Sequence, residues 1–315
     1  MTKNFLHREQ VLAVIDKLAS DYLQGKIRAI RMAMVGLLAG GHLLIEDVPG
    51  LGKTTLALAL SSICGLDFGR VQATSDLMPA DITGLSIFDR TDNQFRFVEG
   101  PIFNHLVLID EINRTLPKTQ SALLEAMEER RVTVEGKTYR LPDPFMVIAT
   151  QNPLEQAGTY PLPESQMDRF LLVTDIGYPP AELEAQIIRQ GGVREQLSAI
   201  QPLMDHQEVA RTRNFVQEQI QLKQSVAAYI QDLLAASRRH SAVSSGISTR
   251  GGLALAAAAR AAAYLEGRAF VVPEDVQKVA GAVLSHRLVL SAQQLGTAQQ
   301  EVVKSLLEET AVPIA

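Results

Sequence analysis

The 315-residue sequence predicts an α/β fold in which a doubly wound parallel sheet is followed by a small all-α domain. The first observation is that four short runs are apolar on both faces, as strands are when helices cover both sides of a parallel sheet. The second is that helical segments alternate with these runs, which is typical of doubly wound folds. The third is that the pattern after about residue 180 is helical throughout. The predicted strands are 42–48, 105–111, 145–151 and 170–176.

The segments around these strands define the other expected elements. Residues 8–39 have apolar positions at helical spacing, with a break near Gly25 and an end at the Gly40–Gly41 pair. Two further segments alternate at period two on both sides of turn residues, which predicts β-hairpins. The predicted helices between strands are 53–64 and 117–130, and the predicted hairpins are 86–100 and 131–141.

Length and composition limit the possible classes of protein. A chain of this length is expected to form about two domains. We place them at residues 1–200 and 201–315, with the boundary between about 195 and 215. The 46% hydrophobic content excludes a disordered chain. The net charge of −5, the 5% aromatic content and the lack of tryptophan argue against general binding of nucleic acid.

The chain contains one cysteine, Cys64, which lies in an apolar helical run. It cannot form an intrachain disulfide, and we expect it to be a small buried apolar side chain. The N-terminus lacks the apolar core of a signal peptide, and no uninterrupted apolar stretch is long enough for a membrane span. These features predict a cytoplasmic protein without a membrane span.

The segment EDVPGLGKT, at 46–54, is close to the phosphate-loop template of Gly, four residues and Gly-Lys-Ser/Thr, but Asp47 stands at the first glycine. Such a loop binds phosphates through successive backbone N–H groups, so its curvature matters more than the side chain at its start. We expect Lys53 to reach the β- and γ-phosphates of ATP and the Thr54 hydroxyl to ligate Mg²⁺. An ordinary strand–turn–helix is the competing interpretation. The expected nucleotide-binding residues here are Asp47, Val48, Pro49, Gly50, Leu51, Gly52, Lys53, Thr54 and Thr55.

Polar residues follow two other predicted strands. Asp110 and Glu111 end the run HLVLIDE, and Asn152 follows FMVIATQ. The carboxyl ends of parallel strands line one crevice, so these side chains are expected beside Lys53. We expect Asp110 to hold hydrated Mg²⁺, Glu111 to act as general base on the attacking water, and Asn152 to orient that water. A solvated strand end and a turn asparagine before Pro153 are the simpler alternatives.

Two long stretches extend this pattern beyond its short motifs. They are GPIFNHLVLIDEINRTLPKTQSALLEAMEERRVTVEG, at 100–136, and ATQNPLEQAGTYPLPESQMDRFLL, at 149–172. Together with DVPGLGKT they resemble the MoxR family of AAA+ ATPases, from about Gly25 to the end of the helical domain. The resemblance implies an AAA+ nucleotide-binding domain with a helical lid. It also implies a phosphate loop in which the first glycine is often not kept.

The same resemblance implies roles for residues outside these motifs. Arg169, in QMDRF, matches the arginine finger, which acts on the nucleotide of the neighbouring subunit. Arg250 matches the sensor-2 arginine at the start of a lid helix, although Ser248-Thr249-Arg250 departs from the more usual Ser-Pro-Arg by one residue. Gly25 is similar to the N-terminal turn that lies near the adenine.

By the resemblance, the two hairpins correspond to the inserts of the helix-2-insert branch of AAA+ proteins. Phe95 and Phe97, on the first hairpin, are expected either to contact a client at the pore of a ring or to pack the hairpin onto its own domain. We weigh the two possibilities equally.

We therefore expect a Mg²⁺-dependent ATPase that remodels or matures partner proteins. A finger that acts in trans requires a neighbour, so the resemblance implies a homo-oligomeric ring, a hexamer, with a protein client. It also implies action together with proteins that bear a von Willebrand factor A domain. The alternatives are a nucleic-acid motor and a nucleotide-gated scaffold without turnover. The acidic charge disfavours the motor, and Glu111 disfavours the scaffold because a scaffold needs no general base.

Overall fold

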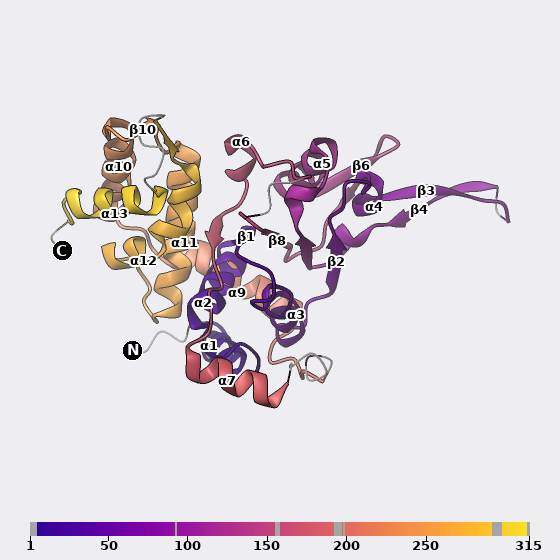
Figure 1. Cartoon of the computed structure of the whole chain (residues 1–315), viewed down its shortest axis with the longest axis horizontal. Helices are drawn as coiled ribbons and strands as arrows, with labels where there is room; N and C mark the ends of the chain where they lie inside the picture. Colours follow the sequence, from indigo (N-terminus) through magenta and orange to yellow (C-terminus); the bar gives the residue numbers. More distant parts are fainter. Residues whose placement is uncertain are drawn as a thin grey trace.

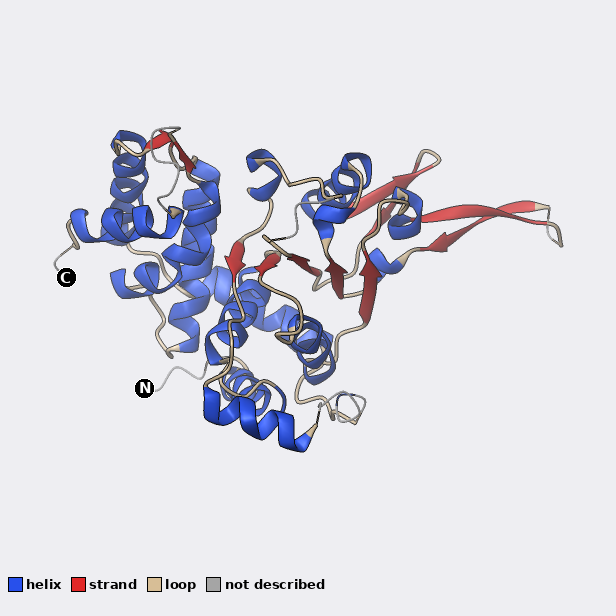
Figure 2. Cartoon of the chain, in the orientation of Figure 1, coloured by secondary structure: helices blue, strands red, loops and turns tan. Residues whose placement is uncertain are grey.

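The computed structural model describes residues 5–91, 93–154, 158–191, 197, 199–291 and 298–313. A central sheet with helices on both sides lies between a group of helices at one end and a long projecting hairpin at the other (Figure 1). Colouring by secondary structure separates these parts, because the projecting hairpin is strand and the opposite end is almost entirely helix (Figure 2). The predicted α/β class with a helical lid is confirmed.

The central sheet has five parallel strands in the order β2-β5-β8-β1-β9. Four of them match the predicted runs to within two residues at each end: β1 (Leu43–Glu46), β5 (Leu106–Asp110), β8 (Met146–Gln151) and β9 (Leu172–Thr174). The fifth, β2 (Phe68–Gln72), is absent from the sequence prediction. It is an edge strand that alternates between buried and exposed residues, so it lacks the continuous apolar run of its neighbours.

The inner strands supply alternate residues to two separate cores. Leu43 and Ile45 of β1 lie in the core on one face of the sheet, and Leu44 lies in the core on the other face. This explains why the inner strands are apolar at every position. The helices of the first core include α1 (Arg8–Lys17), α2 (Ile27–Ala39) and α3 (Lys53–Ile63), and those of the second include α4 (Pro79–Thr83) and α5 (Pro117–Glu129).

The N-terminal helical region is broken where the sequence predicts. A π-helical turn (Leu18–Tyr22) follows α1, and Gly25 adopts a left-handed φ of 76° before α2 begins. Helix α2 ends at Gly40, whose left-handed conformation is a common helix terminator. Cys64 is fully buried one residue beyond α3, and burial raises the pKa of its thiol to about 12.

Both predicted hairpins are present, as β3 (Gly84–Asp89) with β4 (Gln94–Glu99) and β6 (Arg131–Val134) with β7 (Lys137–Arg140). Phe97 stacks on Tyr139 of the second hairpin, with ring centroids 4.1 Å apart. Phe95 is 66% exposed and contacts Phe88 on the paired strand edge-on. The two phenylalanines therefore differ: Phe97 packs the hairpin onto its own domain, whereas Phe95 faces solvent.

The helical end of the molecule is not purely helical. A short antiparallel pair joins β10 (Val243–Ser245) to β11 (Val289–Leu290), so the expectation that strands stop at residue 180 is wrong. These strands are too short for a sequence period to develop. The helices after the sheet are α7 (Ala181–Gln190), α9 (His206–Gln219), α10 (Gln224–Arg239), α11 (Thr249–Leu265), α12 (Pro273–Leu284) and α13 (Gln299–Glu309).

Shorter helical segments complete the description. They are α6 (Glu164–Met167) and the 3-10 turns Pro101–Phe103, Ile112–Arg114 and Ser285–Arg287. None of the helices in the described residues has the length and apolar character needed to cross a membrane.

The expected domain boundary falls partly on residues 192–196 and 198, which lie outside the described residues. Helix α9, which follows it, packs against both α2 of the sheet part and α11 of the helical part. The division into residues 1–200 and 201–315 stays a prediction.

Candidate functional site

A pocket of about 340 Å³ opens at the carboxyl edge of the sheet. It lies where β5 and β8 end and α3 begins, because parallel strands bring their carboxyl ends to one edge. Nine of the predicted site residues line it: Pro49, Gly50, Gly52, Lys53, Thr54, Thr55, Asp110, Glu111 and Asn152. Gly25, Asp47, Val48, Leu51, Arg169 and Arg250 are not among the described residues that line it.

The loop between β1 and α3 is bent by two glycines. Gly50 and Gly52 have φ values of 87° and 98°, a left-handed conformation that is strained for other residues. Lys53, the first residue of α3, donates from Nζ to the carbonyl oxygen of Asp47, which holds its side chain across the loop. Burial lowers the pKa of Lys53, while the nearby carboxylates of Asp110 and Glu111 oppose that shift.

Asp47 has a structural role that explains why the loop does not need glycine there. Its Oδ2 accepts hydrogen bonds from the backbone N–H groups of Ile176 and Gly177, at 2.9 and 2.7 Å. Its Oδ1 accepts from the N–H of Val48, at 2.8 Å. The carboxylate therefore ties the start of the loop to the segment that follows β9. Leu51, in the same loop, packs against the core beside the sheet.

Gly25 lies against this segment rather than in the pocket. A Cβ at Gly25 would stand 2.8 Å from Cδ of Pro180, so a larger residue would collide with the chain after β9. The next residue, Lys26, donates from Nζ to the carbonyl oxygen of Gly177. Leu23 lies within 3.5 Å of the position that a Cβ on Gly52 would take. The N-terminal turn thus contacts the segment that follows β9 and approaches the phosphate loop at Gly52.

The two acids at the end of β5 are held by partners that the sequence analysis misses. Asp110 accepts from Arg70 of β2, with Nε and Oδ2 2.8 Å apart. Glu111 accepts from Arg114 at 2.9 Å and from Gln72 at 3.4 Å. Arg70 and Gln72 are missed because β2 is missed. Once β2 is placed beside β5, the spacing of two residues would direct both side chains to the same face of the sheet, with Gln72 paired to Asp110.

The backbone at the acid pair is also unusual. Glu111 adopts a left-handed φ of 59°, and its N–H donates to Oγ1 of Thr150 on β8, at 2.9 Å. Thr150 is buried and lines the pocket, although nothing in the sequence distinguishes it from other strand residues. Asn152 accepts from the N–H of Leu154 at 3.1 Å, which fixes its side chain as part of a turn at the pocket wall.

The donor set of the pocket suits a hard cation that also binds phosphate. The hydroxyl of Thr54 and the carboxylate of Asp110 are oxygen ligands, which Mg²⁺ prefers. Within the described part of the chain, no group of three or more His, Cys, Asp or Glu side chains could hold a metal ion. A site that offers one or two protein oxygens fits Mg²⁺, which usually completes its shell with water and substrate phosphates.

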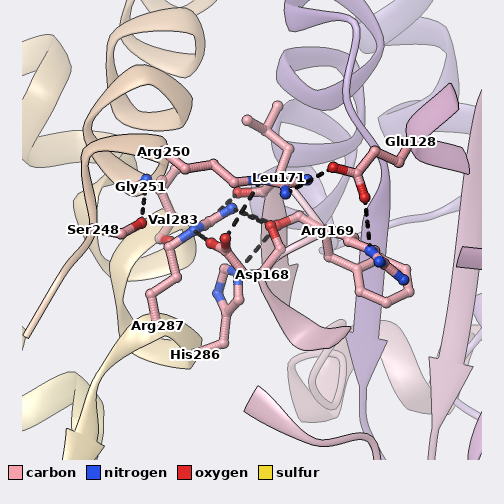
Figure 3. Close-up of polar contacts among 11 residues, drawn as sticks. Glu128, Asp168, Arg169, Leu171, Ser248, Arg250, Gly251, Val283, His286 and Arg287 are labelled. Carbon is pink, nitrogen blue, oxygen red and sulfur yellow. Dashed lines mark hydrogen bonds and ion pairs between the residues drawn. The ribbon is translucent and has the colours of Figure 1, made fainter. Parts of the chain in front are cut away.

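Arg169 and Arg250 meet in a separate group of charged residues, which we call the arginine cluster: Glu128, Asp168, Arg169, Arg250 and Arg287 (Figure 3). Glu128, near the end of α5, forms an ion pair with Nε of Arg169 at 2.9 Å and accepts a hydrogen bond from Nη1 of Arg250 at 3.0 Å. Arg250 also pairs with Asp168, at 3.4 Å. One carboxylate thus joins an arginine of the sheet part to an arginine of the lid.

Arg287 anchors this cluster and is not predicted from the sequence. Its side chain is 4% exposed and donates to Oδ1 of Asp168 at 2.7 Å and to the carbonyl oxygen of Phe170 at 2.7 Å (Figure 3). The adjacent His286 contacts the same carbonyl at 3.1 Å, and burial lowers its pKa to about 3. The lid is therefore fixed to the residues on both sides of Arg169.

Comparison with known families matches two regions of the chain. Residues 42–172 match the ATPase family associated with various cellular activities (AAA), and residues 235–306 match the AAA lid domain. The first region contains the loop, the acid pair, Asn152 and Arg169, and the second contains Arg250.

Individual proteins are similar over nearly the whole chain. Chaperone MoxR1 of Mycobacterium tuberculosis is 39% identical over 92% of this chain and 79% of its own length. Uncharacterized protein YeaC of Bacillus subtilis is 42% identical, with 92% and 91% covered. A crystal structure of a protein from Cytophaga hutchinsonii, described as a candidate ATPase, superposes with a TM-score of 0.89 at 35% identity and covers 98% of this chain and 96% of its own.

Proposed function

The chain belongs to the MoxR family of AAA+ ATPases and is an ATP hydrolase. We propose that it couples Mg²⁺-dependent hydrolysis to the remodelling or maturation of a partner protein. The observation that carries the proposal is the single pocket in which Lys53, the acid pair and Asn152 stand together. The printed name of the M. tuberculosis relative, a chaperone, supports a protein client.

Within the pocket we assign roles by chemistry. Lys53 binds the β- and γ-phosphates, and the loop N–H groups between Asp47 and Thr55 surround them. Thr54 and Asp110 hold Mg²⁺, which supplies charge neutralisation of the phosphates when bound. The Leu23–Lys26 turn, with Gly25 at its bend, contacts the phosphate loop and is our proposed neighbour of the adenine.

Glu111 is the proposed general base and Asn152 the residue that orients the attacking water. The left-handed backbone at Glu111, fixed by Thr150, turns its side chain out of the strand toward the pocket. Arg114 and Gln72 contact Oε2 of the carboxylate, which reduces its freedom to rotate. A positioned base requires such support, because a misplaced carboxylate loses much of its catalytic effect.

Arg169 is proposed as the finger that acts on the nucleotide of a neighbouring subunit, and Arg250 as the sensor-2 arginine of the lid. Both lie outside the pocket of their own chain, and both remain partly exposed in the arginine cluster. Their ion pairs with Glu128 are of the half-exposed kind that contributes little to stability, so the arginines can exchange this carboxylate for a phosphate. We propose that the subunits form a hexameric ring and that the ring acts on a protein client together with a protein that bears a von Willebrand factor A domain.

We also propose a cytoplasmic location. The support is that Cys64, the single cysteine of the sequence, is buried as an apolar side chain.

The proposal is tested with purified protein and its Glu111→Gln variant. The unsubstituted protein should hydrolyse ATP only with Mg²⁺, and Glu111→Gln should bind ATP normally while turnover falls about a hundredfold or more. With ATP present, the variant should retain a protein partner that Lys53→Ala does not retain. Glu125→Gln, an exposed change on α5, is the matched control.

Two outcomes would contradict this function. Unaltered turnover in Glu111→Gln would show that Glu111 is not the general base. Stimulation of hydrolysis by DNA, with salt-dependent binding, would instead favour the nucleic-acid motor.

A further inference from the structure

Arg70 lies in the pocket and takes no part in the roles assigned above. It belongs to the edge strand β2, and its Nε and Nη2 both lie 2.8 Å from Oδ2 of Asp110. Nε donates a charge-assisted hydrogen bond to Oδ2, and Nη2 forms an ion pair with the same oxygen. The Asp110 side chain is 10% exposed, so water screens this pair only in part.

Asp110 is also the carboxylate that is proposed to hold Mg²⁺ beside Thr54. Two cations that share one carboxylate repel each other, and the repulsion is larger in a partly buried pocket than in bulk water. Mg²⁺ also requires a near-ideal arrangement of its oxygen ligands. A guanidinium fixed on Oδ2 therefore restricts both the charge and the orientation that Asp110 can offer to the metal.

The position of Arg70 allows its guanidinium to move away from Asp110. Its side chain is 45% exposed and extends from β2, which is an edge strand of the sheet among the described residues. Its long aliphatic stem allows the guanidinium to move without disturbing the backbone. Arg114 offers a close comparison, because it is also 45% exposed but pairs with Glu111 instead.

We propose that Arg70 competes with Mg²⁺ for Asp110 and thereby sets the magnesium concentration at which the pocket binds nucleotide. Arg70 is a positioning residue, since it acts through Asp110. The inference rests on the proposed function of the pocket, because it presumes that Asp110 is a metal ligand.

The experiment measures binding of a fluorescent ADP analogue to the full chain at constant ionic strength while MgCl₂ is increased from zero. The magnesium concentration at half-maximal binding should fall about tenfold in Arg70→Ala. Arg70→Lys should lower it less, about threefold, because lysine keeps the charge but lacks the planar guanidinium whose Nε donates to Asp110. Arg114→Ala, which removes an equal charge nearby, should change it less than threefold.

The possible outcomes distinguish failure of this inference from failure of the proposed function of the pocket. An unchanged or raised magnesium midpoint in Arg70→Ala overturns the competition. Equal shifts in Arg70→Ala and Arg114→Ala also overturn it, because they reduce the effect to net charge. If Arg70→Ala does not fold, as judged by thermal unfolding without ligand, the Arg70→Lys midpoint decides. Failure of the unsubstituted protein to bind the analogue at any magnesium concentration would overturn the proposed function itself, and this inference with it.

Discussion

The nucleotide pocket and the arginine cluster are built in different ways. The pocket takes its shape from the backbone, namely two left-handed glycines, a left-handed Glu111 and the carboxyl ends of paired strands, while side chains hold its two acids. The cluster is fixed by side chains, since Glu128 joins Arg169 and Arg250 from two parts of the molecule. The first arrangement is preorganised for a ligand. The second can exchange partners at small cost, because partly exposed ion pairs contribute little.

The largest expected effect comes from the cluster. Arg169→Ala should lower turnover about a thousandfold, as loss of an arginine finger does, and change the Kd for ATP less than threefold. Kinetic and equilibrium binding assays measure the two quantities. Arg131→Ala is the control, since Arg131 also forms an exposed ion pair, with Glu129.

Mixing subunits tests whether Arg169 acts in trans. Arg169→Ala subunits keep their pocket, and Lys53→Ala subunits keep their finger, so a mixture should recover part of the turnover that each lacks alone. No recovery of turnover would contradict a role of Arg169 in trans. Full activity of the unsubstituted protein at dilutions where it is a monomer would contradict it as well.

Substitution of Lys53 should greatly weaken nucleotide binding in the pocket. Lys53→Ala should raise the Kd for ATP a hundredfold or more, because it removes the positive charge that we propose to bind the phosphates. Isothermal titration measures the affinity, and Lys118→Ala on α5, an exposed lysine, should leave it unchanged. A normal Kd in Lys53→Ala would mean that the nucleotide binds elsewhere.

His42 lies between β8 and the end of α5 and should make stability depend on pH. It accepts from the N–H of Val147 on β8 and contacts the carbonyl oxygen of Met127, the residue before Glu128. Burial lowers its pKa from 6.5 to about 4. Below pH 6.5 the unfolded chain therefore takes up a proton that the folded chain resists until about pH 4. Stability is full above pH 6.5 and should fall by about 3 kcal/mol as the pH drops to 4.

Urea unfolding between pH 4 and 7 measures this dependence. His42→Gln should flatten the profile, and a residual slope of the same sign should remain from His286, whose pKa is also lowered. His240→Gln serves as the control. A profile that His42→Gln does not alter would show that His42 does not titrate in this range.

Asp47→Gly would restore the common loop template and should nevertheless weaken the site. The substitution leaves the N–H groups of Ile176 and Gly177 without their carboxylate and adds freedom to the unfolded chain. We expect a loss of about 2 kcal/mol in unfolding free energy and about tenfold weaker nucleotide binding. Asp47→Asn keeps one acceptor oxygen, so its unfolding free energy and its nucleotide affinity should lie between those of the unsubstituted protein and of Asp47→Gly. An affinity gain in Asp47→Gly would show that Asp47 only obstructs the loop.

The smallest effect should come from Glu128. Glu128→Gln removes the charge that holds Arg169 and Arg250 but not the arginines themselves, so turnover should change only two- to threefold. Steady-state assays over a range of protein concentrations measure this, with Glu125→Gln on the same helix as control. A loss as large as that of Arg169→Ala would mean that Glu128 is part of the catalytic arrangement.

The sequence by itself determined the strands that are buried on both faces, the bent loop, and the acids at a strand end. Each depends on local pattern: continuous apolar runs, glycines at turn positions, and polar residues directly after a strand. The hairpins were predictable for the same reason, since period-two alternation around turn residues is local. The positions of Lys53, Asp110 and Asn152 in one pocket followed from the parallel sheet alone.

The tertiary structure decided what depends on contacts between distant segments. Arg70 and Gln72 lie on a half-exposed edge strand whose mixed pattern resembles a loop, and their partners are about forty residues away. The role of Asp47 depends on backbone N–H groups 129 and 130 residues further along the chain. The arginine cluster joins α5, the segment before β9 and two parts of the lid. Periodicity indicates which side chains are buried. Only the packing of distant segments decides which charged groups come into contact, and these contacts distinguish the pocket from the cluster.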